Sequence, residues 1–506
     1  MSNLTIFQFF HWYYPSEDPL WKRVAAESRK LSSLGITHFW LPPASKGADG
    51  IYSRGYDPYD LYDLGEFEQK NTTRTKYGTK NEYLAAIRKA HRYKIGILAD
   101  TVLNHKAGAD ELEKFNVVKV DENNRNHKIS EPFEIEGWTK FTFPGRNKKY
   151  SDYIWDFHSF SGIDWAEDKK EQGVFSIINE YGDDWEEMLE DEKGNYDYLM
   201  HADVEFRNPA VRDEIKHWGE WFQQITDVDG YRMDALKHIT PGFIKEWVEH
   251  MKGVTQKPLL FIGEYWNIHN VVAVKQYTEA TGGNVQLFDA PLVNNFHMAS
   301  RSGRDFDLRN IFNHTLLQTD PWVSIPLVHS HDLQPLQALD TPIENWFKVL
   351  AYALILLREQ GIPCVFYPDV YGANYKDKGH DGNDYDITIT SVDGIEMMLK
   401  LRKLMAYGPQ RDYFDHNNCI GWIREGVREF MYSGCVVLMS NGDEGYKKME
   451  IGKRHAGKMF VDALGKRQEK ITIGKDGWGE FYCNGGSVSV WVREEAMRRL
   501  VIDVQS

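Results

Sequence analysis

Short apolar runs alternate with longer amphipathic segments along most of this chain, and this alternation limits the fold more than any other feature. A buried strand followed by a helix is the unit from which parallel sheets are built. Pro209 and Pro241 suit the first turns of two such helices. Eight of these units predict an α/β fold, the (β/α)8 TIM barrel, although an open doubly wound sheet would show the same periodicity.

The expected elements are therefore short strands and longer helices in strict alternation. The strands are expected at residues 4–10, 36–41, 95–103, 229–233, 259–264, 285–288, 324–328 and 362–367. The helices between them include residues 20–34, 82–93, 209–225, 241–251 and 346–358.

Two intervals break this alternation. Between residues 104 and 207 the chain is rich in Asp, Asn, Gly and aromatic residues and has little helical period, so we expect a small domain inserted after the third strand. Beyond Gly408 the segments are short, β-branched and separated by turns. The expected domains are a barrel of residues 1–103 and 208–408, an inserted, mainly irregular or β domain of residues 104–207, and a C-terminal antiparallel β-sandwich of residues 409–506.

The composition restricts the possible partners. A net charge of −15 argues against nucleic acid and anionic membrane surfaces, because both bind basic patches. Aromatic residues make up 14% of the chain, which favours a carbohydrate ligand because aromatic rings stack on sugar faces. Plain solubility explains the charge equally well, and any single ring is more often a core residue.

The N-terminus and the cysteines indicate a location. Residues 1–10 lack a basic region, a long apolar core and a small-residue cleavage site, so they predict a buried strand rather than a leader. The four cysteines show no Cys-x-x-Cys spacing, which argues against zinc and favours buried free thiols. No segment is long and apolar enough to span a bilayer. We therefore expect a cytoplasmic protein, and a monomer rather than an oligomer.

Three carboxylates stand at the ends of expected strands. Asp234 follows the fourth strand, Glu264 ends the fifth and Asp332 follows the seventh. A single carboxylate in such a place is usually a helix cap or a solvated charge. Because the carboxyl ends of barrel strands meet on one rim, the three together predict an active site there. Carboxylates in different environments suit acid–base and nucleophilic work on a glycosidic bond.

The segments around these residues carry a family resemblance. They are Asp100-Thr101-Val102-Leu103-Asn104-His105, Gly230-Tyr231-Arg232-Met233-Asp234, Phe261-Ile262-Gly263-Glu264 and Val328-His329-Ser330-His331-Asp332. With further matches at residues 9–15, 55–67, 195–200 and 484–490, the sequence resembles the α-amylase family (glycoside hydrolase family 13) over nearly its whole length. It is most similar to the bacterial liquefying-type members, especially those that are cytoplasmic and have no leader.

The resemblance implies a role for each carboxylate. Asp234 matches the nucleophile that forms a covalent glycosyl-enzyme, Glu264 the general acid/base, and Asp332 the carboxylate that binds sugar hydroxyls and stabilises the transition state. A retaining enzyme of this kind holds its two reacting carboxyl groups about 5–5.5 Å apart. The implied substrate-binding residues are Tyr56, His105, Arg232, Lys237, His238 and His331. Arg232, two residues before Asp234, is expected on the same side of the strand.

The resemblance also implies calcium. Asn104, Asp197, Asp203 and the backbone carbonyl of His238 match family ligands, and oxygen ligands suit this cation. Asp184 matches a further carboxylate of an extended metal cluster.

The sequence departs from the family pattern at three places, which affect the expected metal ions, the positioning of Asp332 and chloride binding. Ser161 stands where relatives with the extended cluster place Asp, which argues against additional metal ions. Ser330 replaces the usual Asn before His331, and a modest effect on Asp332 is expected. The eighth strand lacks the Arg of chloride-dependent relatives, so chloride is not expected.

These features predict an endo-acting, retaining hydrolase of α-1,4-glucosidic bonds in starch, glycogen or maltodextrins. An exo-acting maltooligosaccharide-forming enzyme, an α-glucosidase and a transglycosylase of the same superfamily remain alternatives, although Lys237 and His238 favour α-amylase over α-glucosidase. A non-catalytic glucan-binding relative is a remote alternative, since such proteins usually lose an active carboxylate. Trp422, Trp478 and Trp491 are candidates for a starch-binding face, with core packing expected for at least two of them.

Overall fold

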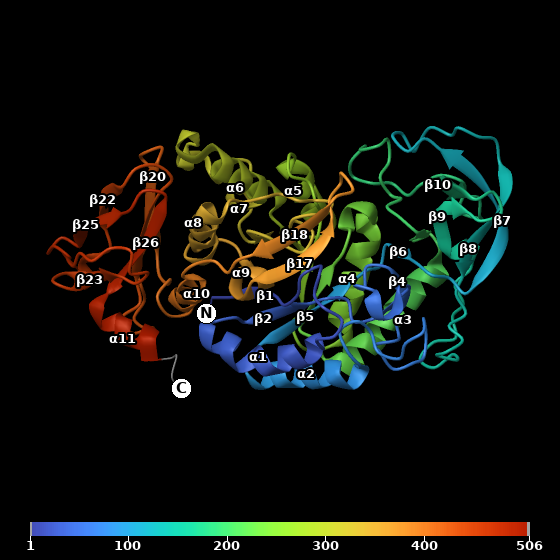
Figure 1. Cartoon of the computed structure of the whole chain (residues 1–506), viewed down its shortest axis with the longest axis horizontal. Helices are drawn as coiled ribbons and strands as arrows, with labels where there is room; N and C mark the ends of the chain where they lie inside the picture. Colours follow the sequence, from blue (N-terminus) through green and yellow to red (C-terminus); the bar gives the residue numbers. More distant parts are fainter. Residues whose placement is uncertain (1–2, 503–506) are drawn as a thin grey trace.

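A parallel sheet forms the centre of the molecule in the computed structural model, which describes residues 3–502 (Figure 1). Its eight strands have the order β15-β14-β13-β12-β5-β2-β1-β16. The strands are β1 (Ile6–Gln8), β2 (His38–Leu41), β5 (Gly96–Thr101), β12 (Gly230–Met233), β13 (Leu260–Gly263), β14 (Gln286–Phe288), β15 (Ser324–Ile325) and β16 (Cys364–Phe366).

The two outer strands of this order meet. Leu327, just beyond β15, forms a parallel bridge with Cys364 of β16. The Cys364 amide donates to the carbonyl oxygen of Pro326 at 2.9 Å. The sheet therefore closes into the expected barrel, and the open doubly wound alternative is wrong. All eight expected strands are confirmed with shorter bounds, because the flanking residues turn into loops.

Helices cover the outside of the barrel (Figure 1). Helix α1 (Leu20–Leu34) ends at Gly35, whose φ of 106° is left-handed and favours glycine. Helix α2 (Lys80–Arg92) begins with a capping box between Thr79 and Glu82. The other helices of the barrel are α3 (Pro209–Thr226), α4 (Pro241–Val254), α5 (Val271–Ala280), α6 (Ala290–Ser302), α7 (Leu316–Thr319), α8 (Asn345–Leu356), α9 (Tyr367–Tyr371) and α10 (Ile395–Leu404). Helix α11 (Glu494–Ile502) belongs to the C-terminal part of the chain and packs on α10. Within residues 3–502, every helix is too short or too polar to cross a membrane.

An antiparallel sheet lies at one end of the molecule (Figure 1). It comes from the chain between β5 and β12 and has the order β6-β11-β9-β10-β7-β8. Its strands are β6 (His105–Lys106), β7 (Glu111–Val120), β8 (Phe133–Lys140), β9 (Phe160–Ala166), β10 (Glu171–Ile177) and β11 (Ala202–Val204). The insertion after the third barrel strand is thus confirmed, and it is more regular than its composition indicated.

Two facing antiparallel sheets form the other end (Figure 1). The larger has the order β19-β20-β21-β26-β23-β24, and the hairpin of β22 and β25 packs on it. The strands are β19 (Gln410–Tyr413), β20 (Cys419–Arg424), β21 (Cys435–Ser440), β22 (Gly445–Glu450), β23 (Met459–Asp462), β24 (Ile471–Thr472), β25 (Trp478–Cys483) and β26 (Ser487–Arg493). Val436 and Leu438 share a buried core with Met449 and Phe481 of the hairpin, so the predicted β-sandwich is confirmed.

The three candidate tryptophans of this sandwich divide as expected. Trp422 and Trp491 are fully buried, whereas Trp478 is 41% exposed. Core packing therefore accounts for two of the three, and the described cysteines are buried free thiols.

Two short hairpins lie outside these sheets. Strands β3 (Lys46–Gly47) and β4 (Pro58–Asp60) pair near the start of the barrel, and β17 (Ala373–Lys378) pairs with β18 (Asp384–Ile389) after β16. Neither hairpin was predicted.

We propose domain boundaries after residues 103, 207 and 408. Strand β6 begins at His105, helix α3 at Pro209 and strand β19 at Gln410, so each boundary falls in a short connection. These element bounds support the three-domain division expected from the sequence.

Candidate active site

The three strand-end carboxylates line one cleft of about 670 Å³, formed by barrel loops together with residues of the insertion. Asp234 follows β12, Glu264 follows β13, and Asp332 lies in the loop after β15. The Asp234 amide donates to the carbonyl of Thr101 and the Glu264 amide to that of Met233, both at 3.0 Å. These bonds continue the barrel ladder beyond the strands and fix the backbone that carries both carboxylates.

Arg232 on β12 is the charged centre of the site. Its Nη1 donates to Asp234 Oδ1 at 2.6 Å and to Asp100 Oδ1 at 2.9 Å. Its Nη2 donates a short hydrogen bond to Glu264 Oε2. The buried guanidinium lies 4.9 Å over the ring of Trp40. The expectation that Arg232 faces Asp234 is confirmed, and the same cation is shared with two further carboxylates.

Burial raises the pKa of three carboxylates around Arg232 by different amounts. Burial raises the pKa of Glu264 to about 8, with Asp332 and Asp234 adding to the shift and Arg232 opposing it. Burial also raises the pKa of Asp332 to about 7 and that of Asp100 to about 6, again against Arg232. Desolvation outweighs the guanidinium at Glu264 because Arg232 divides its charge among several carboxylates. Glu264 therefore holds a proton near neutral pH.

Three rings, of Trp12, Tyr56 and His331, form a cluster of mutual contacts at the cleft. The ring centroid of Tyr56 lies 5.8 Å from that of Trp12 and 5.0 Å from that of His331, and the centroids of Trp12 and His331 are 6.1 Å apart. Tyr56 Oη donates to Asp100 Oδ2 at 2.7 Å, which orients its ring. Tyr56 was predicted here from the sequence, whereas Trp12 and Asp100 were quoted in matching segments without a role.

His331 is held as a neutral ring. Burial and then Arg232 lower its pKa well below the usual value. Gln8 Nε2 donates to His331 Nδ1 at 3.1 Å, which leaves the ring proton on Nε2. That nitrogen lies 3.3 Å from Asp332 Oδ2 and has no hydrogen-bond partner within the described residues. It can therefore donate to a bound hydroxyl group.

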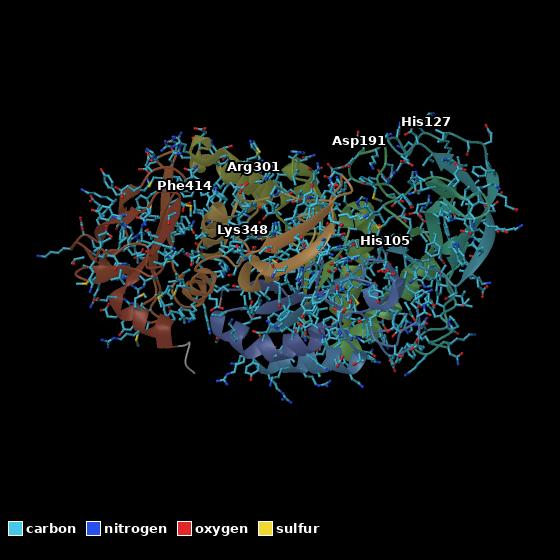
Figure 2. All side chains as sticks on the ribbon, viewed as in Figure 1. His105, His127, Asp191, Arg301, Lys348 and Phe414 are labelled. Atoms are coloured by element: carbon cyan, nitrogen blue, oxygen red, sulfur yellow. The ribbon has the colours of Figure 1, made fainter. Side chains whose placement is uncertain are left out.

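His105, Lys237 and His238 line the same cleft, as predicted. His105, labelled in Figure 2, begins β6 of the insertion, and its Nε2 donates to the carbonyl of Tyr56 at 2.9 Å. His238 Nδ1 donates to the carbonyl of Tyr196 at 2.6 Å, and burial lowers the pKa of His238 to about 3. Both histidines are thus positioned by backbone carbonyls.

Ser330 is one of the three departures from the family pattern, and the structure shows its surroundings. Ser330 lines a small cavity of about 10 Å³ together with Arg232, Glu264 and Asp332. A cavity of this size is at the lower limit for one water molecule. The short side chain therefore leaves a void beside the carboxylates rather than a contact with them.

The three side chains expected as metal ligands, Asn104, Asp197 and Asp203, are buried. Asn104 Nδ2 donates to Asp203 Oδ1 at 3.1 Å, while Asn104 Oδ1 is buried without a partner in the described part of the chain. Burial, then Asp197, raises the pKa of Asp203 well above its usual value, and burial raises the pKa of Asp197 to about 7. A buried amide oxygen without a donor beside two carboxylates in mutual repulsion fits an oxygen-binding cation.

The number of side chains available to hold a metal ion at this place is nevertheless small. Among the described residues, no group of three or more His, Cys, Asp or Glu side chains is arranged to hold a metal ion. Ser161 Oγ donates to Asp203 Oδ2 at 2.6 Å, so this oxygen is already occupied. Asp184 is not brought to Asp197 and Asp203 as a buried ligand: it is 73% exposed and pairs with Arg207 at 2.9 Å.

Glu186 was not predicted as part of this region. It is 5% exposed, and both of its carboxylate oxygens lack a hydrogen-bond partner among the described residues. Burial, followed by Asp197 and Glu205, raises its pKa to about 9. No strand-end position marks Glu186 in the sequence, because it lies in the connection between β10 and β11.

The comparisons with known proteins agree with this geometry. A barrel whose strand ends bring carboxylates into one cleft is an arrangement that can carry out glycoside hydrolysis. Residues 29–407 match the family described as "Alpha amylase, catalytic domain", and residues 435–492 match "Alpha-amylase C-terminal". The chain belongs to the α-amylase family.

Similar proteins cover the chain almost completely. The cytoplasmic alpha-amylase of Escherichia coli K12 is 50% identical over 498 residues, which are 98% of this chain and 100% of the relative. An alpha-amylase of Geobacillus stearothermophilus is 46% identical over 97% of this chain and 87% of the relative. The glucan 1,4-alpha-maltohexaosidase of Bacillus sp. strain 707 is 42% identical over 97% and 93%.

A solved structure supports the fold alone. The alpha-amylase of Geobacillus thermoleovorans, complexed with acarbose, superposes with a TM-score of 0.63 at 17% identity and covers 97% of this chain and 98% of that one.

Proposed function

We propose that the protein is an endo-acting, retaining hydrolase of α-1,4-glucosidic bonds in starch, glycogen or maltodextrins. The observation that carries the proposal is the shared contact of Arg232 with Asp234 and Glu264 on one cleft. The two carboxylates to which we assign the roles of nucleophile and acid thus share one cation, and burial raises the pKa of Glu264, which supports its role as the acid. Membership of the α-amylase family, with relatives named alpha-amylases, supports the substrate class.

Each carboxylate has one task in this mechanism. Asp234 attacks the anomeric carbon, the glycosidic C–O bond breaks, and Glu264 gives its proton to the leaving oxygen. A water molecule then attacks the same carbon. Glu264 takes a proton from that water, and the ester bond to Asp234 breaks. Asp332 binds hydroxyl groups of the reacting sugar together with the Nε2 proton of His331.

The remaining cleft residues bind the chain around the scissile bond. Tyr56 stacks beneath the reacting sugar and His105 lies beside it, while Lys237 and His238 contact the sugars on the leaving-group side. Arg232 holds the carboxylates of Asp234 and Glu264 in position through its hydrogen bonds. These assignments rest on the family match and on the common lining of one cleft.

An end-blocked maltoheptaose tests the endo action. The protein is expected to cleave this substrate, because an open cleft admits an internal segment of the chain. An obligate exo-enzyme or an α-glucosidase would leave it intact, so lack of cleavage beside hydrolysis of the unblocked heptaose contradicts the proposal. Absence of reducing-sugar release from soluble starch would instead favour the non-catalytic alternative.

The pH dependence follows from the state of Glu264. Only its protonated form can act as the acid, and its pKa lies at about 8 because of burial, with Asp332, Asp234 and Asp100 raising it and Arg232 lowering it. The value of kcat/KM for a maltooligosaccharide is therefore expected to fall as pH rises through about 8. A profile that stays flat to pH 9.5 would contradict this assignment.

We also propose that calcium binds at Asn104, Asp197, Asp203 and the backbone carbonyl of His238. Bound there, the cation neutralises the two buried carboxylates and joins the insertion to the barrel. No additional ion is proposed at Asp184, and no chloride.

Chelation tests this cation site. Excess EDTA is expected to lower the midpoint of thermal unfolding, because the ion binds only the folded chain. Calcium added back should restore the midpoint, whereas the same concentration of potassium should not. An unchanged midpoint after exhaustive dialysis against EDTA, with no metal found by elemental analysis, would exclude a structural ion.

The cellular setting is proposed from the same observations. We propose a cytoplasmic monomer, with no nucleic acid or membrane as partner. The net charge of −15 and the similarity to the cytoplasmic alpha-amylase of Escherichia coli support this setting.

A further inference from the structure

One segment of the insertion approaches the barrel beside the catalytic acid. We call residues 186–195 the acidic loop, because Glu186, Glu187, Glu190, Asp191 and Glu192 lie in it. Glu187, Asp191 and Glu192 are exposed, but the side chain of Glu190 is only 18% exposed. Glu190 therefore faces the protein within a loop whose neighbouring carboxylates face solvent.

Glu190 accepts hydrogen bonds from the loop that follows Glu264. Tyr265 Oη donates to Glu190 Oε2 at 2.7 Å. Asn267 Nδ2 donates to Oε1 at 2.8 Å and to Oε2 at 3.1 Å, and Asn270 Nδ2 makes a longer contact of 3.4 Å. Hydrogen bonds to an ionised carboxylate are stronger than those between neutral groups.

The donors are themselves held in place. Asn267 Oδ1 accepts from the amides of His269 and Asn270 at 3.0 Å and 2.9 Å, which turns its Nδ2 toward Glu190. Asn270 caps α5 through its Oδ1, and its Nδ2 likewise points to the loop. Tyr265 is 2% exposed and packs 4.8 Å from the ring of Tyr277. A rigid set of donors thus meets one carboxylate of the acidic loop.

Little else fixes the acidic loop on that side. An open hollow of about 460 Å³ separates it from α5, and the hollow is lined by Glu187, Met188, Asn195, Ala273 and Gln276 among others. Because side chains do not fill this space, apolar packing does not hold the loop against the barrel there. The hydrogen bonds of Glu190 cross the gap.

Within the insertion, the acidic loop is held by the Arg125 amide, which donates to the carbonyl of Lys193, and by Asn126 Nδ2, which donates to the carbonyl of Gly194, both at 2.8 Å. Two further contacts of the loop or its flank reach the barrel, and both belong to the cleft. Glu192 pairs with Lys237, and the carbonyl of Tyr196, just beyond the loop, accepts from His238 at 2.6 Å. These four residues line the cleft, whereas Glu190 does not. Glu190 therefore acts on the cleft through its neighbours, and one of these is Lys237, whose Nζ lies 3.8 Å from Glu190 Oε2.

We propose that Glu190 is a positioning residue for the leaving-group side of the cleft: its carboxylate holds the acidic loop against the loop after Glu264 and so places Glu192, Tyr196 and Lys237 around the departing sugars. This proposal rests on the proposed function, because only the proposed reaction defines which side of the cleft binds the leaving group.

Two substrates and three variants test the proposal. Maltoheptaose places sugars on the leaving-group side, whereas α-maltosyl fluoride loses only fluoride there. Glu190→Ala removes the acceptor, and Glu190→Gln keeps the size but sets an amide donor against the donors of Tyr265 and Asn267. Asp191→Asn is the matched control, because Asp191 is the exposed neighbour on the same loop (Figure 2).

Glu190→Ala is expected to raise KM for maltoheptaose roughly tenfold, the effect of losing hydrogen bonds to a charged acceptor, and Glu190→Gln by less. The value of kcat/KM for α-maltosyl fluoride should stay within about twofold for all three variants, and Asp191→Asn should match the wild type on both substrates. Unchanged kinetics of Glu190→Ala with maltoheptaose, or equal losses on both substrates, overturns the proposal.

Hydrogen exchange separates this proposal from the proposed function. Amides of residues 186–195 should exchange at least about tenfold faster in Glu190→Ala than in Asp191→Asn, while the barrel strands stay protected. Equal exchange in the two variants overturns the positioning role whatever the activity. A wild type that is inactive on both substrates contradicts the proposed function and leaves the exchange result to decide the role of Glu190.

Discussion

Replacing Asp234 with Asn is expected to lower kcat on soluble starch by roughly 10⁴-fold or more, because the amide cannot form the covalent glycosyl-enzyme. The fold should survive. Asn keeps an oxygen that accepts from Arg232 Nη1, which lies 2.6 Å from Asp234 Oδ1 in the native site. The measurement is steady-state reducing-sugar release, with the thermal midpoint of each variant as the check on folding.

A covalent trap gives this prediction a second, independent readout. A fluorinated glycosyl fluoride that slows the second step should add one glycosyl mass to the peptide containing Asp234. Asp213→Asn is the control, since Asp213 lies on α3 with 77% of its side chain exposed. It should show wild-type turnover and labelling. Labelling of a different carboxylate would remove Asp234 from the nucleophile's role.

Replacing Glu264 with Gln is expected to lower kcat for maltooligosaccharides by about 10²- to 10⁴-fold, because the leaving oxygen no longer receives a proton. The loss should be far smaller for the first step of α-maltosyl fluoride cleavage, since fluoride leaves without such a proton. The decline of kcat/KM near pH 8 should also vanish from the variant, as the group responsible for it is absent. Rapid-quench measurement of glycosyl-enzyme formation checks the first point.

Azide provides the decisive comparison for Glu264. A small anion needs no general base, so azide should accelerate the second step of the Glu264→Gln reaction and yield an α-glycosyl azide. The same addition should leave Asp234→Asn inactive. Azide rescue of neither variant, or an unaltered wild-type pH profile in Glu264→Gln, would show that another group acts as the acid/base.

The barrel could be predicted because its strands are buried on both faces. Strand β5 contains the apolar run Ile97–Ala99 and β12 buries Tyr231 and Met233, and helix α3, which lies before β12, has one apolar face. The hairpin of β22 and β25 in the C-terminal sandwich shows the opposite pattern. Its outer face carries Tyr446 and Lys448, so the buried positions are diluted by polar ones and the apolar run disappears.

The carboxylates could be predicted for a topological reason, since strand ends meet wherever the barrel closes. Their surroundings could not. The contact of Arg232 with Asp100 joins residues 132 positions apart, and that of Gln8 with His331 spans 323 positions. No local pattern encodes which nitrogen of His331 carries its proton. Glu190 was invisible in a run of similar acidic residues, because only the folded chain distinguishes it from Asp191.

The position of Arg232 between Asp234 and Glu264 has a consequence for the energetics of turnover. In the proposed first step Glu264 becomes an anion as it releases its proton, and Asp234 becomes a neutral ester. In the second step the two groups exchange these states. The summed charge of the pair next to the guanidinium is therefore the same before, between and after the steps. The guanidinium of Arg232 stays paired with one negative charge throughout turnover. The surrounding dipoles therefore need not reorient as this charge moves between Asp234 and Glu264.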